Sequence, residues 1–286
     1  MTEQMSRISR KGLLIAIIAM GTLLAVLLAV VFVLNIFGSS PDPVHTPAQM
    51  AFAPMPEEPV YAEPEANPYG VEDFVYDGDY LSCVAGESVL GMDISAWQTV
   101  DDWQAVKDAG IEFVMIRVGY RGYGEGTILA DEAAQSHYEG ARSVGLKVGV
   151  YFFSQAVNTL EAVEEARFTL DLIRDWQIDM PVVYDWEYVS EDARTWWLEE
   201  DDLTHATMAF CNAVEDAGYE PMVYFNQNQG WYMLHLERLT DYDFWLAMYS
   251  DQMDYPYRLD MWQYTCEGTV PGIEGPVDLN LWFPEG

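Results

Sequence analysis

The sequence predicts an α/β protein built as an irregular, single-domain TIM-like β/α barrel, preceded by a transmembrane helix and a disordered linker. Short apolar runs alternate with amphipathic stretches from Gly91 onward, which is typical of a parallel sheet covered by helices. Eight such runs occur, and eight parallel strands can close into a barrel. Polar and aromatic residues gather where the runs end, as they do at the carboxyl ends of barrel strands that carry a site.

The N-terminal region is predicted to place the chain in a membrane. Residues 1–12 form a basic tail with Arg7, Arg10 and Lys11, and residues 13–37 are an uncharged apolar run. About 20 apolar residues suffice to cross a bilayer as a helix, and positive flanks stay cytoplasmic. We therefore expect a single-pass signal anchor in the cell membrane, with the rest of the chain on the extracellular, cell-wall side. The alternative is a cleaved signal peptide, whose apolar region normally spans only about 7 to 15 residues.

Residues 38–89 are expected to be an acidic, Pro-rich extracellular linker that holds the barrel away from the bilayer. The whole chain has a formal net charge of -34 at pH 7. A charge of this sign repels phosphate backbones, so nucleic acid is excluded as a partner and a neutral polymer is favoured.

The barrel is expected over residues 90–286. Its strands are predicted at 91–95, 112–120, 147–155, 180–188, 221–227, 243–250, 259–265 and 276–282, and its helices at 100–109, 131–144, 159–176, 201–217 and 228–236. Gly110, Gly145 and Gly218 follow three of the helices, where a left-handed residue ends a helix. The last three strands leave little room for helices, so an irregular barrel is expected. A doubly wound open sheet is the alternative, although the sequence has no Gly-rich phosphate loop.

Two carboxylates, Asp185 and Glu187, end the apolar run VVYDWEYV. Residues i and i+2 of a strand point to the same side, so both should face one cavity while Trp186 faces away. Like charges this close raise the pKa of one carboxyl group, which leaves one acid and one base. Hydrolysis of a glycosidic bond needs this division. An isolated DxE in an acidic chain is often only a solvated loop, so its place after a buried strand is what favours a function.

Asp93 and Asp278 end two further predicted strands, so four carboxylates are expected at one barrel end. A hard cation could use such oxygens, but neither the acids nor the scattered Cys and His residues have a regular ligand spacing. No metal and no cofactor are therefore expected. Aromatic and polar residues at the other strand ends suit a sugar ring, and the predicted substrate-binding residues are Arg117, Tyr120, Tyr151, Tyr224, Asn226, Trp245, Tyr249 and Gln263.

Two further features have open alternatives in the sequence. Trp196 and Trp197 either line the cleft or cap the next helix. Cys83 and Cys266 could form a disulfide if the ends of the barrel domain lie close together, whereas Cys211 falls on the apolar face of a helix and is expected in the core.

The ordered series GMDISAWQ, DDWQAVKDAGIEFVMIRVGYRGYG, GLKVGVYFFSQA, PVVYDWEYV, GYEPMVYFN, DFWLAMYS and MWQYTCEGTVPGIEGPVDLN resembles glycoside hydrolase family 25, the Chalaropsis-type lysozymes, over residues 90–283. The resemblance implies an irregular β/α barrel and an N-acetylmuramidase that cleaves the β-1,4 bond between N-acetylmuramic acid and N-acetylglucosamine in peptidoglycan, in cell-wall remodelling. Many members carry a histidine where this chain has Phe152. The alternatives are a chitinase-like glycosidase and a non-catalytic wall-binding module.

The same resemblance implies roles for the four acids. Glu187 would be the general acid/base, and Asp185 would orient the acetamido group that attacks the anomeric carbon. Asp93 and Asp278 would hold the local charge pattern and the sugar. Whether the nucleophile is the acetamido group or a carboxylate is left open.

Overall fold

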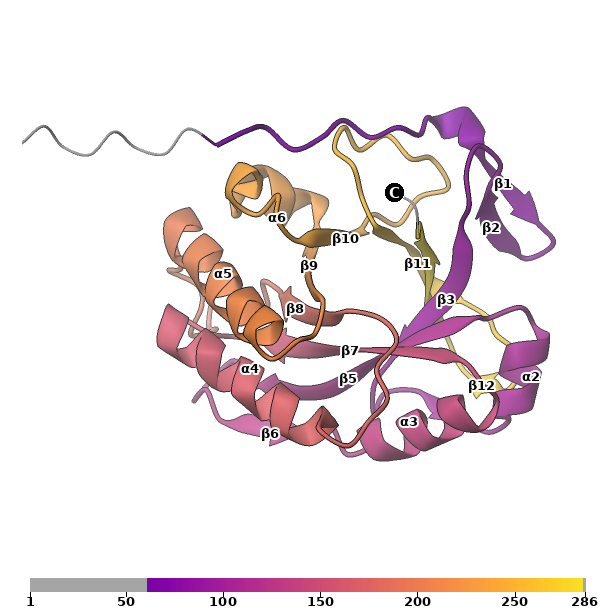
Figure 1. Ribbon diagram of the computed structural model, residues 1–286, viewed down its shortest axis with the longest axis horizontal. Coiled ribbons are helices and arrows are strands. Elements are labelled where there is room, and N and C mark those ends of the chain that lie inside the picture. The colour runs from indigo at the N-terminus through magenta and orange to yellow at the C-terminus, as the bar shows by residue number, and fades with distance from the viewer. Residues whose placement is uncertain (1–60, 285–286) are drawn as a thin grey trace, which may run out of the picture. The chain divides into compact units, whose positions relative to one another are not determined.

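Eight strands close into a barrel in the computed structural model, which describes residues 61–284 (Figure 1). In order around the barrel they are β3 (Val89–Ile94), β5 (Phe113–Arg121), β7 (Lys147–Ser154), β8 (Val182–Trp186), β9 (Pro221–Asn226), β10 (Asp243–Ala247), β11 (Met261–Gly268) and β13 (Val277–Trp282). All eight predicted strands are present. β3 pairs with β5 on one side and with β13 on the other, which closes the ring of eight strands. The alternative of an open doubly wound sheet is therefore wrong.

The last strand, β13, runs antiparallel to both of its neighbours, whereas the other seven strands are parallel. The prediction that Asp278 ends a strand is therefore wrong, since Asp278 lies near the beginning of β13. It still reaches the same barrel end because it pairs directly with Asp93 of β3. A parallel strand needs a crossover of a dozen or more residues, and the short connection 269–276 between β11 and β13 is too short for one.

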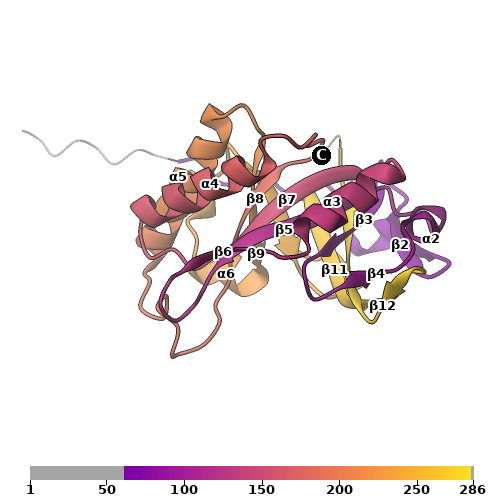
Figure 2. The ribbon, with the colours of Figure 1, turned by 90° about the horizontal axis from the view of Figure 1, so that it is seen from below.

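Helices cover the outside of the barrel. They are α2 (Trp103–Asp108), α3 (Ala134–Ser143), α4 (Thr159–Ile173), α5 (Glu200–Asp216) and α6 (Gln227–Tyr232), with short 3₁₀ turns η1 (Val71–Asp73) and η2 (Leu236–Arg238). Figures 1 and 2 show α4 and α5 side by side over β7 and β8. Gly110, Gly145 and Gly218 have φ values of 97°, 76° and 86°, which confirms the predicted left-handed residues after three helices.

Five short strands were not expected: β1 (Phe74–Asp77), β2 (Tyr80–Cys83), β4 (Thr99–Val100), β6 (Ile128–Ala130) and β12 (Ile273–Glu274). The first two form a hairpin inside the segment predicted as a linker. Phe74 of this hairpin is buried, and its ring centre lies 5.0 Å from that of Trp262 in an edge-to-face arrangement. The Asn67 backbone N–H donates a hydrogen bond to the Pro256 carbonyl. The structure thus differs from the expected linker in residues 61–89, because these apolar side chains pack on the barrel.

The predicted basic tail 1–12, the transmembrane helix 13–37 and linker residues 38–60 lie outside the described residues. Within residues 61–284, no helix is both long enough and apolar enough to span a bilayer.

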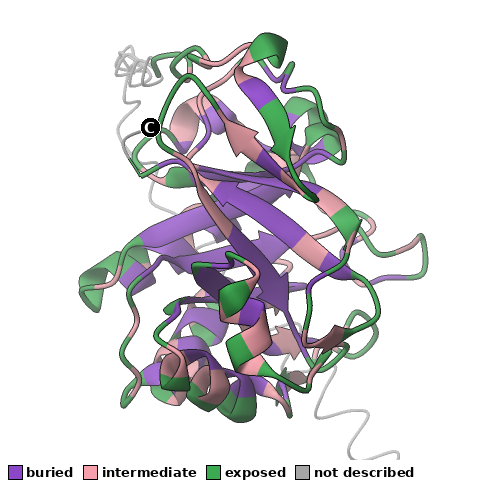
Figure 3. Cartoon of the chain, turned by 90° about the vertical axis from the view of Figure 1, so that its right-hand side faces the viewer, coloured by how far each residue is buried: buried purple, intermediate pink, exposed green. Residues whose placement is uncertain are grey.

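Two apolar clusters follow from the alternation of side chains along each strand. In β5, Val114 and Ile116 face outward to the cluster beneath the helices, whereas Phe113 and Met115 face the barrel interior. The interior cluster also contains Tyr151, Met180, Val183, Met222, Tyr224, Trp245, Ala247 and Met261. Figure 3 shows the strands as the buried centre of the molecule. Side chains fill the interior, so only the mouth of the barrel is left for ligands.

The three cysteines, Cys83, Cys211 and Cys266, are free thiols, so the disulfide between Cys83 and Cys266 that the sequence left open is not formed. Cys83 lies near Tyr69, whose ring packs against Phe283 beyond the end of β13. Cys266 instead lies beside Tyr249 and Asp278 at the mouth. The two thiols are therefore at opposite ends of the barrel. Cys211 is buried in α5, as predicted.

Candidate active site

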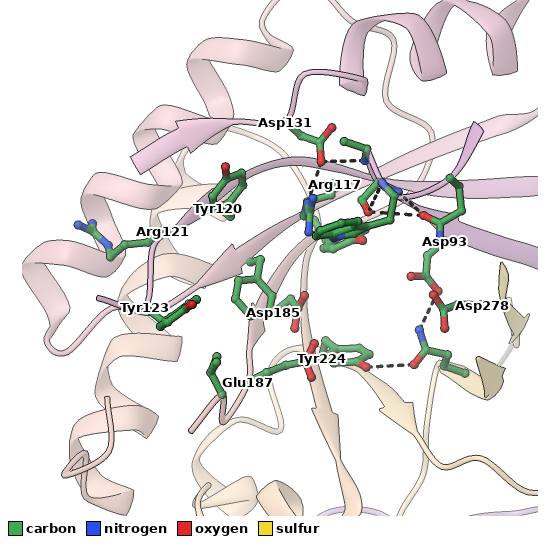
Figure 4. A pocket seen from close by; sticks show the side chains of 18 of the residues that line it. Asp93, Arg117, Tyr120, Arg121, Tyr123, Asp131, Asp185, Glu187, Tyr224 and Asp278 are labelled. Carbon is green, nitrogen blue, oxygen red and sulfur yellow. Dashed lines mark hydrogen bonds and ion pairs between the residues drawn. The ribbon is translucent and has the colours of Figure 1, made fainter. Parts of the chain in front are cut away.

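A cavity of about 760 Å³ opens at the carboxyl ends of the parallel strands (Figure 4). Its lining includes all four predicted catalytic carboxylates, Asp93, Asp185, Glu187 and Asp278. Asp185 belongs to the end of β8 and Glu187 follows it directly, and both point into the cavity. Trp186 between them is buried in the outer apolar cluster. The prediction from the strand period is confirmed for this pair.

Asp93 is buried and is hydrogen-bonded to neutral partners. Its Oδ2 accepts a hydrogen bond from the Gln263 amide at 2.7 Å and another from the Asn280 amide at 2.9 Å. Burial raises the pKa of Asp93 well above its ordinary value, and Asp278 raises it further, although the two amides act in the opposite direction. The two amides therefore hold this carboxyl group in one orientation, and no cation of residues 61–284 forms an ion pair with it.

The pKa values of Asp185, Glu187 and Asp278 are raised as well. Burial raises the pKa of Asp185 well above its ordinary value, and the neighbouring Glu187 adds to this shift. Burial also raises the pKa of Glu187, with a further contribution from Asp278. The pKa of Asp278 itself is raised by burial to about 6. Crowded carboxyl groups of this kind retain protons at a pH where isolated acids have lost them.

Two buried glutamines hold the backbone at the end of β8. The Gln155 amide donates to the Glu187 carbonyl at 2.7 Å, and the Gln229 amide donates to the Trp186 carbonyl. Thr195 in turn donates to Gln155 Oε1 at 2.9 Å. Side-chain amides therefore satisfy these two carbonyls at the end of β8 and fix the backbone that carries Asp185 and Glu187. Sequence reasoning missed this role because both glutamines come from other elements.

Arg117 is the cation closest to the pair. Its Nε lies 2.8 Å from Asp131 Oδ2, and its guanidinium lies 5.3 Å from the centre of the Tyr120 ring. Its charge lowers the pKa of Asp185, in opposition to burial. Arg121 also lines the cavity wall, but its side chain is directed away from the carboxylates (Figure 4). Asp131, which positions Arg117, was missed by sequence reasoning because it lies on a loop.

The cavity brings together most of the predicted substrate-binding residues: Arg117, Tyr120, Tyr151, Tyr224, Trp245, Tyr249 and Gln263. Tyr224 and Tyr249 donate to Gln263 Oε1 at 3.0 and 3.2 Å. Asn226 is not among the lining residues, in contrast to its predicted role. Its side chain caps α6 by accepting a hydrogen bond from the Gln229 backbone. The N-cap preference of asparagine explains this placement.

Two exposed aromatic residues, Trp97 and Tyr123, also line the cavity. Both lie on loops beyond strands, where no period identifies the direction of a side chain, so sequence reasoning missed them. Phe152, which replaces a histidine common in the family that this chain resembles, points outward and packs 6.2 Å from Phe168. The phenylalanine at position 152 therefore does not change the set of side chains that line the cavity.

The cavity combines a proton donor, further carboxylates and aromatic walls. Within residues 61–284, no cluster of His, Cys, Asp or Glu is arranged to hold a metal ion. A buried carboxyl pair at a barrel mouth of this size suits acid/base cleavage of a glycosidic bond. The fold and the site thus define a glycoside hydrolase, which acts on O-glycosyl bonds.

Comparisons with known proteins agree with this class. The model of glycosyl hydrolases family 25 matches residues 92–273. The uncharacterized protein YegX of Escherichia coli strain K12 is 30% identical over 216 residues, which cover 69% of this chain and 71% of YegX. The autolytic lysozyme of Clostridium acetobutylicum is 28% identical over 200 residues, covering 68% of this chain and 56% of that protein.

Among solved structures, the modular autolysin LytC of Streptococcus pneumoniae in complex with a synthetic peptidoglycan ligand matches with a TM-score of 0.59 and 27% identity. The match covers 69% of this chain but only 47% of the LytC chain, so this chain spans about half the length of that relative. The chain belongs to glycosyl hydrolases family 25.

Proposed function

We propose that this glycoside hydrolase is a membrane-anchored muramidase of the cell wall. The enzyme is a peptidoglycan hydrolase that cleaves the β-1,4 bond between N-acetylmuramic acid and N-acetylglucosamine. The observation that carries the proposal is the pair Asp185 and Glu187 in the cavity of a family 25 barrel. The autolytic lysozyme and the peptidoglycan complex of LytC among its relatives support the substrate.

In the proposed mechanism, Glu187 is the general acid. Its raised pKa keeps a proton available for the leaving glycosidic oxygen, and the ionised residue then serves as the base for the incoming water. Gln155 holds the Glu187 backbone, so the carboxyl group approaches the bond from a fixed position. Such fixed placement removes part of the orientational cost of the reaction.

Asp185 is proposed to orient the acetamido group of the muramic acid residue, which attacks the anomeric carbon. Its Oδ1 is buried and has no hydrogen-bond partner among the described residues, so it is available to a substrate N–H group. Asp93 and Asp278 hold the sugar and maintain the charge of the site. A carboxylate nucleophile is the competing mechanism, and glycan with deacetylated muramic acid separates the two: only the acetamido mechanism loses cleavage with it.

The N-terminal apolar run, residues 13–37, is proposed to anchor the enzyme as a single-pass helix in the cell membrane, with the barrel on the cell-wall side. This placement suits local wall remodelling. In untreated cells, the full chain should fractionate with membranes. Protease added to intact spheroplasts should remove the barrel, because the barrel lies outside the membrane. Recovery of the full chain in the culture medium or in the cytoplasm would exclude the anchor.

Product analysis tests the activity. The full chain should release fragments from purified peptidoglycan whose reducing ends, after borohydride reduction, are muramitol. Reduced glucosamine ends would identify a different bond and contradict the proposal. Efficient cleavage of chitin oligomers, which lack the lactyl group, would favour the chitinase-like alternative, and binding to the wall without new reducing ends would favour the non-catalytic module.

A further inference from the structure

The loop between β8 and α5, residues 187–199, begins with the catalytic Glu187 and carries three aromatic side chains. Trp197 is 84% exposed and Tyr188 is 49% exposed. The half-buried Trp196 lies between them, with its ring centre 5.6 Å from that of Tyr188 and 5.9 Å from that of Trp197. Neither tryptophan is among the residues that line the cavity, so the alternative that places them in the cleft is wrong. Contiguous apolar side chains exposed on a surface indicate an interaction site.

This loop is held in place by a partly buried ion pair. The Arg194 guanidinium donates two hydrogen bonds to the Glu161 carboxylate, at 2.6 and 2.7 Å, and one to the Gln155 carbonyl. Thr195, the next residue, is buried and donates to Gln155. The exposed aromatic side chains therefore stand on a fixed backbone. A fixed surface loses little conformational entropy when it binds a ligand.

The aromatic surface begins where the cavity ends. Tyr123 and Val189 both line the cavity, and the Arg194 backbone N–H donates to the Tyr123 carbonyl at 2.8 Å. The loop that carries Trp197 therefore abuts the cavity wall. A polymer that leaves the cavity on this side passes directly onto the loop.

We propose that Tyr188, Trp196 and Trp197 form a distal glycan-binding surface that holds the N-acetylated glycan chain beyond the catalytic cavity. The inference rests on the proposed function, because it needs a polymeric substrate that extends past the bond being cleaved. Exposed aromatic faces with polar edges suit sugar rings.

The negative charge of the loop disfavours the binding of anionic phosphate-bearing ligands. Glu191, Asp192 and Glu199 are exposed around the aromatic side chains, and the chain as a whole carries a formal charge of -34. Phosphate-bearing polymers and anionic lipid surfaces are repelled by such a surface. A membrane contact through Trp197 is the competing occupant.

The test compares two substrates with the full-length chain. The parent, Trp197→Ala and the control Tyr76→Ala are assayed on polymeric glycan strands and on a tetrasaccharide of two disaccharide repeats. Tyr76 is an exposed aromatic residue on β1, outside the cavity lining, so its replacement controls for loss of surface apolar area. We expect Trp197→Ala to lower the ratio of kcat/KM for strands to kcat/KM for the tetrasaccharide about 3- to 10-fold, the effect of losing one aromatic contact. The ratio for the control should equal that of the parent.

The outcomes separate the two proposals. If the parent cleaves neither substrate, the proposed function fails. If the parent cleaves both and Trp197→Ala leaves the ratio unchanged, the distal surface is refuted while the muramidase activity stands. Quenching of tryptophan fluorescence by brominated phospholipid, with the full chain in vesicles of neutral and anionic lipid, is the last measurement: quenching in the parent that is lost in Trp197→Ala, together with an unchanged ratio, assigns the loop to the membrane instead.

Discussion

The barrel mouth and the outer surface of α4 both gather acidic residues, but they differ in the partners that these acids receive. On α4, Glu161 receives two hydrogen bonds from the Arg194 guanidinium, which lower its pKa. In the mouth, Asp93 receives its hydrogen bonds from the neutral amides of Gln263 and Asn280, and its pKa is raised. A cation stabilises the charged form of an acid, whereas an amide positions the acid with a smaller effect on its charge.

Burial adds a second difference. Glu165, also on α4, is fully buried, and its pKa is raised to about 7 even though Arg121 and Ser154 donate to it. Pairing with a cation therefore does not always outweigh desolvation. What distinguishes the mouth is that desolvation and like charges act together on the same acids. The acids of α4 hold elements together, while those of the mouth are kept able to exchange protons.

The largest expected effect comes from removing the proton donor of the mouth. Glu187→Gln should lower kcat on peptidoglycan by about 10²- to 10⁴-fold, the usual contribution of general acid/base catalysis. Reducing ends released per enzyme per unit time measure this. Glu164→Gln is the matched control, because Glu164 is an exposed acid of α4 that pairs with Arg121. Equal rates for Glu187→Gln and the parent would remove Glu187 from its proposed role.

The ion pair of the outer region should contribute to stability. Arg194→Met should lower the free energy of unfolding by about 1.5 to 3 kcal/mol, the range for hydrogen bonds to a charged group that is partly buried. Denaturant unfolding of Arg194→Met, Glu161→Gln and the double variant measures the coupling. We expect the double variant to lose less than the sum of the single losses, since the two residues share one interaction. Additive losses would show that the pair contributes nothing as a pair.

The buried amide of Gln155 should affect kcat because it fixes the position of the Glu187 backbone. Gln155→Met leaves the Glu187 carbonyl without its donor, and we expect kcat to fall about 10-fold with little change in KM. The pH at which the rate is half-maximal should also shift, because the environment of Glu187 changes. Thr207→Val, which removes a buried hydrogen bond within α5, is the control. A change in KM alone would indicate a role in binding instead.

The smallest expected effect is a gain in stability. The folded-state pKa of Asp278, about 6, lies above its ordinary value of 3.8, so the folded chain binds more protons than the unfolded chain between these pH values. The stability therefore falls as the pH rises from about 4 to 6, and the loss is complete above that window. Asp278→Asn should raise Tm at pH 7 by about 2 to 4 °C and reduce this pH dependence. Calorimetry from pH 4 to 7 measures both, with exposed Asp254→Asn as control. A lower Tm at pH 7 would contradict like-charge crowding at the mouth.

The sequence by itself determined the eight strands, the helices that end at Gly110, Gly145 and Gly218, and the common direction of Asp185 and Glu187. Each of these depends on a short-range pattern: the period of a strand, the period of a helix, or the backbone freedom of glycine. The same patterns placed most of the cavity residues, because strand ends of a closed barrel converge at one end.

Only the tertiary structure decided the direction of β13, the amide contacts of Gln155 and Gln229 and the ion pair of Arg194 with Glu161. Each long-range contact joins residues from different elements whose pairing depends on how the ring closes. A local pattern predicts the direction of a side chain but not the groups that it contacts. The pKa of an acid depends on those neighbouring groups.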